Sequence, residues 1–145
     1  MTKFTAASFA GPRAFARHML QGDRLTLAPL PGSMRAFGGI AMECVLFRQS
    51  CWQVELITML PGIQVPQHRH LRVRSADLAL GGDGAGVIGG RPMGQGQRGG
   101  LCSNLLRIEK NVWHSGFAGP QGVMFLSFQQ WDGPPALISD DWDTA

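Results

Sequence analysis

The alternation of apolar and polar residues after residue 40 predicts a series of short strands. Trp52–Leu60 places polar side chains on one face and mostly apolar ones on the other. Val123–Trp131 begins apolar on both faces, as an inner strand does. Ala41–Phe47, Ser75–Leu80 and Leu101–Ile108 are further stretches of strand length, and turn-forming residues separate them. We therefore expect an all-β antiparallel barrel or sandwich rather than alternating strands and helices.

Glycine-rich segments interrupt this pattern at two places. Gly81–Gly100 holds ten glycines in twenty residues, so it can form either a short strand with a hairpin or a flexible loop. Gly119–Gly122 predicts a turn between a strand around Trp113–Phe117 and the last strand.

Residues 1–39 differ in character from the rest of the chain. Pro12–Leu20 predicts a short helix, because proline is tolerated at the first helical position. A helix of this length is not stable in water unless it packs against something. We expect residues 1–39 to form an irregular or short-helical arm on a barrel of residues 40–145, or on a neighbouring subunit. His18, within this arm, is expected to be a surface or helix-face histidine.

Composition excludes several classes of protein. The 145 residues suffice for one domain with its own core. The chain has no run of 18 apolar residues, and its N-terminus lacks the apolar segment of a secretory signal. Its three cysteines form no Cys-x-x-Cys pair, which indicates reduced thiols. The net charge is +3, but the basic residues are scattered. We expect no membrane span, no secretion and no direct nucleic-acid partner.

Three of the four histidines are the strongest candidates for chemistry. His68 and His70 lie two residues apart, so in a strand both side chains point to the same face. With His114 downstream, they could bind a divalent ion or a polar ligand. Such a pair also arises without a ligand role, and that alternative stays open at this point.

Other catalytic motifs are absent from the sequence. It has no phosphate-binding loop of the Gly-x-x-x-x-Gly-Lys type and no serine in a Gly-x-Ser-x-Gly setting. Glu43, Glu55 and Glu109 are single carboxylates without an evident partner. No catalytic residue is therefore assigned.

The segments around these histidines resemble the two motifs of the cupin superfamily. Gly62–Asp77 resembles the first motif, and Ile108–Phe117, with His114, resembles the second. The run from Trp52 to Asp143, with its closing Gln130–Trp142 segment, is also similar to small cupin proteins of tailed bacteriophages. The resemblance implies a jelly-roll barrel that holds a divalent metal ion (Zn, Mn, Fe or Ni) through three histidines.

One departure from the cupin pattern concerns the fourth ligand. The family carries a carboxylate four or five positions after the second histidine, where this chain has Arg74 and Ser75. Asp77 could replace it on a twisted or bulged strand. Alternatively, Arg72 and Arg74 could bind an anion at the site.

Two functions remain under consideration. The resemblance to phage proteins and the arm favour a binding or structural module, with other virion proteins or further copies of the chain as partners. Its place would be the virion or the host cytoplasm. The alternative is a metal-dependent cupin enzyme of the sugar isomerase or oxygenase type.

Deletion of residues 1–35 is expected to leave a folded barrel that no longer assembles. The apolar side chains of the arm are too many to leave in water, since burying each large one contributes roughly 1.5–3 kcal/mol. Light scattering would measure the oligomeric state, and circular dichroism the fold. An unchanged oligomer and unchanged incorporation into particles would contradict this expectation.

Overall fold

A computed structural model of the chain describes residues 34–37, 41–95 and 105–144, and nearly all of its regular structure is strand. The described strands are β1 (Met34–Phe37), β2 (Ala41–Gln49), β3 (Trp52–Met59), β4 (Gln64–His70), β5 (Val73–Ile88), β6 (Arg91–Gln95), β7 (Leu105–Ile108), β8 (His114–Trp131) and β9 (Trp142–Thr144). A short 3₁₀ helix, η3 (Ile138–Asp141), precedes β9. The expected all-β fold is confirmed.

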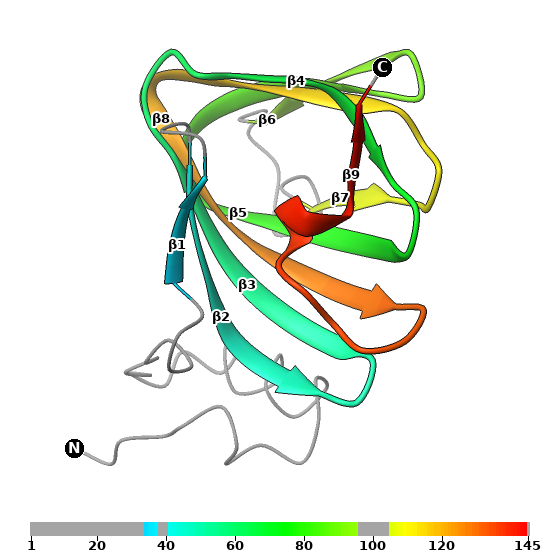
Figure 1. Ribbon diagram of the computed structural model, residues 1–145. Helices are drawn as coiled ribbons and strands as arrows, with labels where there is room; N and C mark the ends of the chain where they lie inside the picture. Colours follow the sequence, from blue (N-terminus) through cyan, green and yellow to red (C-terminus); the bar gives the residue numbers. More distant parts are fainter. Residues whose placement is uncertain (1–33, 38–40, 96–104, 145) are drawn as a thin grey trace, which may run out of the picture.

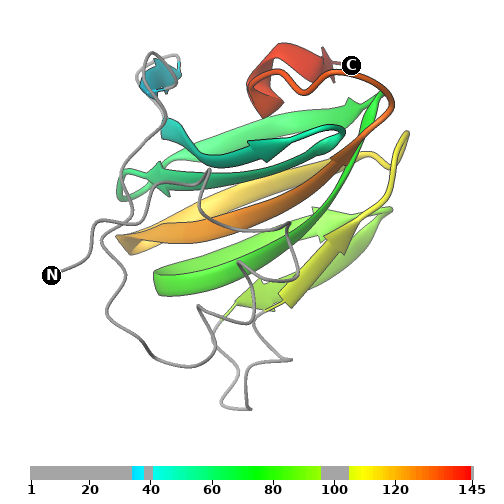
Figure 2. The same ribbon diagram turned by 90° about the horizontal axis from the view of Figure 1, so that it is seen from below.

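The strands form one antiparallel sheet that curls into a half barrel (Figure 1). The order along one path is β1-β2-β3-β8-β4-β9, and β5 pairs with β6, β7 and β8. Figure 2 shows β2, β3, β8 and β5 side by side in one twisted layer. Within the described part of the chain, no helix is long and apolar enough to cross a membrane.

The longest strand, β8, joins both halves of the curled sheet. It pairs with β3 from Met59↔Val123 to Trp52↔Gln130. It also pairs with β5 from Val73↔Trp131 to Ile88↔His114. Near its start it pairs with β4, where His68 lies opposite His114.

The turn predicted at Gly119–Gly122 is not observed, because the chain continues through it as part of β8. Gly82 pairs with Val123 and Gly84 with Ala118, so the four intervening residues form a bulge. Gly122 has a φ of 71°, and a Cβ there would lie 2.6 Å from the Met59 carbonyl oxygen. The glycines therefore serve a close approach of backbones within the sheet.

The glycine-rich stretch after Leu80 is a hairpin rather than a loop over its described part. Its first eight residues belong to β5, and β6 pairs back on them with Ile88 opposite Arg91. Gly89 and Gly90 have φ angles of 55° and 77°, the sign that a tight two-residue hairpin turn requires. Residues 96–104 lie outside the described part of the chain.

Two apolar clusters use opposite faces of the sheet. Leu126 belongs to one cluster, whereas Phe125, the residue before it in β8, packs against the other. The first cluster consists of Cys44, Leu46, Phe47, Val54 and Leu126. The second, on the concave face, consists of Ile57, Met59, Val73, Ala118, Val123, Trp131 and Ile138.

Part of the predicted arm lies in the sheet. Met34–Phe37 forms β1 and pairs with β2 from Met34↔Cys44 to Phe37↔Ala41. The predicted helix Pro12–Leu20 and His18 lie outside the described residues. A truncation that leaves the sheet intact should therefore end before Met34.

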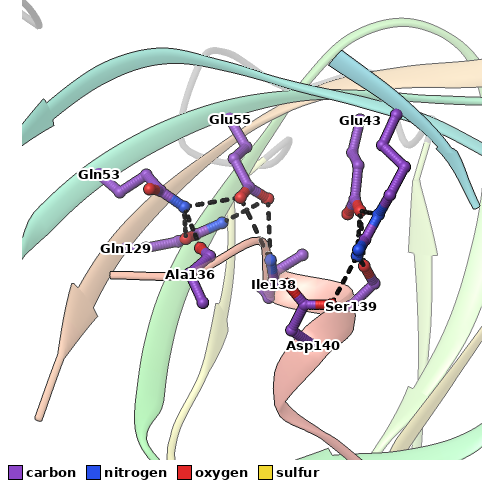
Figure 3. A network of polar contacts seen from close by, with 9 residues as sticks. Glu43, Gln53, Glu55, Gln129, Ala136, Ile138, Ser139 and Asp140 are labelled. Carbon is purple, nitrogen blue, oxygen red and sulfur yellow. Dashed lines mark hydrogen bonds and ion pairs between the residues drawn. The ribbon is translucent and has the colours of Figure 1, made fainter. Parts of the chain in front are cut away.

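A buried polar network anchors the C-terminal segment to the concave face (Figure 3). Gln53 donates from Nε2 to Glu55 at 2.6 Å, and Gln129 donates to Glu55 at 3.0 Å. The backbone N–H of Ile138 donates to Glu55 at 3.2 Å, and Gln53 also donates to the Ala136 carbonyl at 2.6 Å. The sequence-based view of Glu55 as a carboxylate without a partner was wrong.

Substitution of Gly82 by Ala is expected to lower the free energy of unfolding by about 1–3 kcal/mol. Gly82 has a φ of 84°, and its added Cβ would lie 2.1 Å from the carbonyl oxygen of Gly122. The neighbouring Gly81 has open space around the same position. Urea denaturation should therefore show G82A well below G81A in midpoint, and equal midpoints would contradict this packing.

Substitution of Glu55 by Gln is expected to flatten the dependence of stability on pH. Burial is the main cause that raises the pKa of Glu55 from 4.5 to about 8, although hydrogen bonds from Gln129 and Ile138 oppose it. The folded protein thus keeps a proton that the unfolded chain releases above its own pKa. Between these two pKa values the free energy of unfolding falls as pH rises, by at most about 1.4 kcal/mol per pH unit from this group.

Urea denaturation at several pH values between about 5 and 8 tests this, because E55Q should lack that fall. E109Q, which changes an exposed carboxylate, is the matched control. Equal pH slopes for E55Q and the unmodified protein would show that Glu55 does not hold the proton.

Candidate functional site

Strands β4 and β8 bring His68, His70 and His114 together, as the resemblance to the two cupin motifs implied. His68 and His114 are register partners, and their ring centroids lie 4.1 Å apart. The His70 centroid lies 5.1 Å from that of His68 and 5.0 Å from that of His114. One ring nitrogen from each lies within 4.8 Å of the other two. All three side chains are buried.

Backbone carbonyls set the orientation of two of these rings. His68 Nδ1 lies 2.9 Å from the Pro66 carbonyl oxygen, and His114 Nδ1 lies 2.9 Å from that of Val112. A carbonyl oxygen only accepts, so each Nδ1 carries the proton and each Nε2 keeps its lone pair. His70 Nδ1 is buried and has no hydrogen-bond partner among the described residues.

Burial keeps the three imidazoles neutral. It lowers the pKa of His68 to about 4, with repulsion from His114 as the next cause. It lowers the pKa of His70 to about 3, with repulsion from His114 and His68 adding to the effect and the charge and backbone of Asp141 acting against it. The pKa of His114 is also lowered by burial. Neutral imidazole is the form that binds a metal ion.

The C-terminal segment covers the histidine cluster. Trp142 lies opposite His70 in the β4–β9 pairing, and its ring stacks on His68 with centroids 3.9 Å apart. Ion pairs at 2.8 Å between Arg72 and Asp141, and at 2.7 Å between Arg69 and Asp143, hold this segment to β4 and the bend after it.

The histidines open onto a cavity of about 150 Å³ in the concave face. Most of its wall is apolar, and its polar side chains come from several strands and from η3. These polar side chains are His68, His70, His114, Glu43, Ser75, Asp77, Ser115 and Ser139. Glu43 is neutralised by Arg35 at 2.9 Å and accepts a hydrogen bond from Ser139, so it also has partners that the sequence did not reveal.

Asp77, the predicted fourth ligand, lines this cavity but is not part of the histidine cluster. It lies on β5 and is buried, which raises its pKa to about 6, although hydrogen bonding from the Ser127 and Ser75 hydroxyls acts in the opposite direction. A metal-binding role for Asp77 stays a prediction.

Arg72 and Arg74, the predicted anion-binding residues, point away from the cavity. Arg74 is exposed and donates from Nε to Gln130 at 2.8 Å. Arg72 pairs with Asp141, and its guanidinium lies 5.5 Å from the Trp131 ring centroid. Neither lines the cavity, so the structure does not bring them to the histidines.

Comparison with known proteins gives structural neighbours. No protein-family model and no curated protein matches the sequence. The KdgF structure from a Halomonas species matches 71% of this chain and 86% of its own, with a TM-score of 0.59 and 9% identity. The cupin domain of Cnp3 from Schizosaccharomyces pombe matches 70% of each chain, with a TM-score of 0.57 and 12% identity.

An RmlC-like cupin from Shewanella frigidimarina matches 67% of this chain and 81% of its own, with a TM-score of 0.57 and 13% identity. Nothing in these comparisons links the chain to phage proteins. Identities this low establish similarity of fold alone. The chain therefore has the fold of the cupin superfamily, with a cluster of three histidines on its concave face.

Proposed function

We propose that the chain is a metal-binding cupin module that takes a small ligand in its cavity. His68, His70 and His114 would hold one divalent ion, which would face the cavity. The observation that carries this proposal is the convergence of three buried, neutral imidazoles whose nitrogens lie within 4.8 Å of one another.

The donors in the cluster fit a metal ion better than they fit a purely structural core. The Nδ1 atoms of His68 and His114 face backbone carbonyls, which leaves the Nε2 lone pair of each ring for a metal ion. Imidazole nitrogen suits Zn, Fe and Ni, whereas Mn²⁺ prefers oxygen ligands and would need a carboxylate such as Asp77. The donor set therefore favours the first three metals.

The chain's own residues would divide the work of binding. The carbonyls of Pro66 and Val112 orient His68 and His114, and Trp142 shields the cluster on one side. The apolar wall would hold the body of a ligand. A bound ion would supply a Lewis acid that polarises an oxygen of that ligand.

Binding is the function that the geometry supports, and no observation on the described residues favours the catalytic alternative over it. The predicted role in assembly rests on residues 1–39, of which Met34–Phe37 alone are described. That role, with its virion or subunit partners, stays a separate prediction.

Replacing any one of His68, His70 and His114 by Ala is expected to weaken metal binding at least about tenfold, since even residues that orient metal ligands have effects of that size. Equilibrium dialysis against Zn²⁺, Ni²⁺ or Fe²⁺ with elemental analysis measures the bound metal. The unmodified protein should bind about one ion per chain and melt at a higher temperature with it.

Replacement of His18 by Ala is the control, because His18 is the fourth histidine and is not predicted to be a ligand. Absence of bound metal in the unmodified protein, or equal binding by all four variants, would contradict the proposal.

A further inference from the structure

Two buried oxygen atoms on β5 face the cavity without a hydrogen-bond partner in the described part of the chain. They are Ser75 Oγ and Asp77 Oδ1; the Ser75 and Ser127 hydroxyls lie close enough to the Asp77 carboxyl to lower its pKa, but neither makes a well-formed hydrogen bond to Oδ1. Ser75 and Asp77 are each 8% exposed, and both line the cavity that contains the histidines. Because the two residues are separated by two positions in one strand, they share its inward face.

Leaving such atoms unpaired is costly. A buried donor or acceptor without a partner costs about 1–3 kcal/mol, and more if it is charged. Folded proteins contain few such groups, and each calls for an explanation. The two glutamates of the concave face are paired, since Glu55 accepts three hydrogen bonds and Glu43 is bonded by Arg35 and Ser139.

The surroundings define what could satisfy these atoms. The cavity wall next to the histidines is apolar and includes Ile57, Met59, Val65, Ile88, Phe125 and Trp142. An apolar cavity of about 150 Å³ can hold a molecule the size of a benzene ring. The ligand therefore needs a small apolar body with a polar group at one end.

The chemistry of the two side chains defines that polar group. A carboxylate oxygen accepts hydrogen bonds, and a serine hydroxyl both donates and accepts. We propose that Ser75 and Asp77 form a subsite that binds the hydroxyl group of a ring-sized, mostly apolar ligand. The hydroxyl donates to Asp77 Oδ1 and accepts from Ser75 Oγ, while the ring packs on the apolar wall.

This inference rests on the proposed function for the cavity but assigns Asp77 to the ligand rather than to the metal ion. A site built to bind a hydroxyl discriminates against an analogue without one, because its buried polar groups are then left unpaired. The discrimination should persist without metal, since neither Ser75 nor Asp77 belongs to the histidine cluster.

Phenol and toluene are the matched probes, because they have similar size and only phenol donates a hydrogen bond. Saturation-transfer NMR measures both dissociation constants, with chelator-treated protein and with Zn²⁺-loaded protein. Phenol is expected to bind at least tenfold more tightly than toluene. S75A and D77N should each reduce this ratio at least threefold, with little change for toluene.

Three controls keep the outcomes separate. D132N changes an exposed aspartate that pairs with Lys110 and should leave the ratio unchanged. D77N should retain the full metal content, and thermal melting should show that both cavity variants fold. Discrimination in chelator-treated protein that binds no Zn²⁺ would support the subsite while defeating the metal proposal.

Several results would overturn the subsite. These are failure of both probes to bind, equal affinity for phenol and toluene, or an unchanged ratio in D77N and S75A. Loss of metal from D77N would instead assign Asp77 to the ion and would also overturn it.

Discussion

The pairing of β8 with β5 is the constraint on which the rest of the structure depends. It extends from Val73↔Trp131 to Ile88↔His114, so it runs the full length of both strands. Between Ala118 and Val123, β8 has four residues where β5 has one. These four residues, Gly119–Gly122, form the bulge that lets the backbone pairing continue on both sides. On the N-terminal side of the bulge, β8 pairs with β4 instead of β3. This pairing places His114 opposite His68. The histidine cluster is thus a product of strand register.

Strand periodicity made much of the fold and of the cluster predictable. The two-residue spacing of His68 and His70 already placed both rings on one face, and the apolar pattern marked β2, β3 and the second half of β8. Glycine was the ambiguous signal. Because glycine has no side chain, it is common both in loops and where two backbones approach closely. The pairing of β5 with β6 and β8 shows that Gly81–Ile88 is a case of close backbone approach.

Features that depend on distant or irregular backbone could not be predicted in this way. Continuous alternation from His70 would place Arg72 and Arg74 inside, but a bend at residues 71–72 shifts the phase of the next strand. Ser75 and Asp77 therefore face inward instead. Two of the three partners of Glu55 lie 74 and 83 positions away, at Gln129 and Ile138. No local pattern contains contacts of that separation.

The position of β9 has a practical consequence for handling the protein. Thr144 lies opposite His68 in the pairing of β9 with β4, so a peptide fused at the C-terminus would begin within one or two residues of the cluster. A polyhistidine tag there would present additional imidazoles next to the native ones and would compete with them for added metal ions. Recombinant protein intended for metal analysis should carry its affinity tag elsewhere, or have it removed.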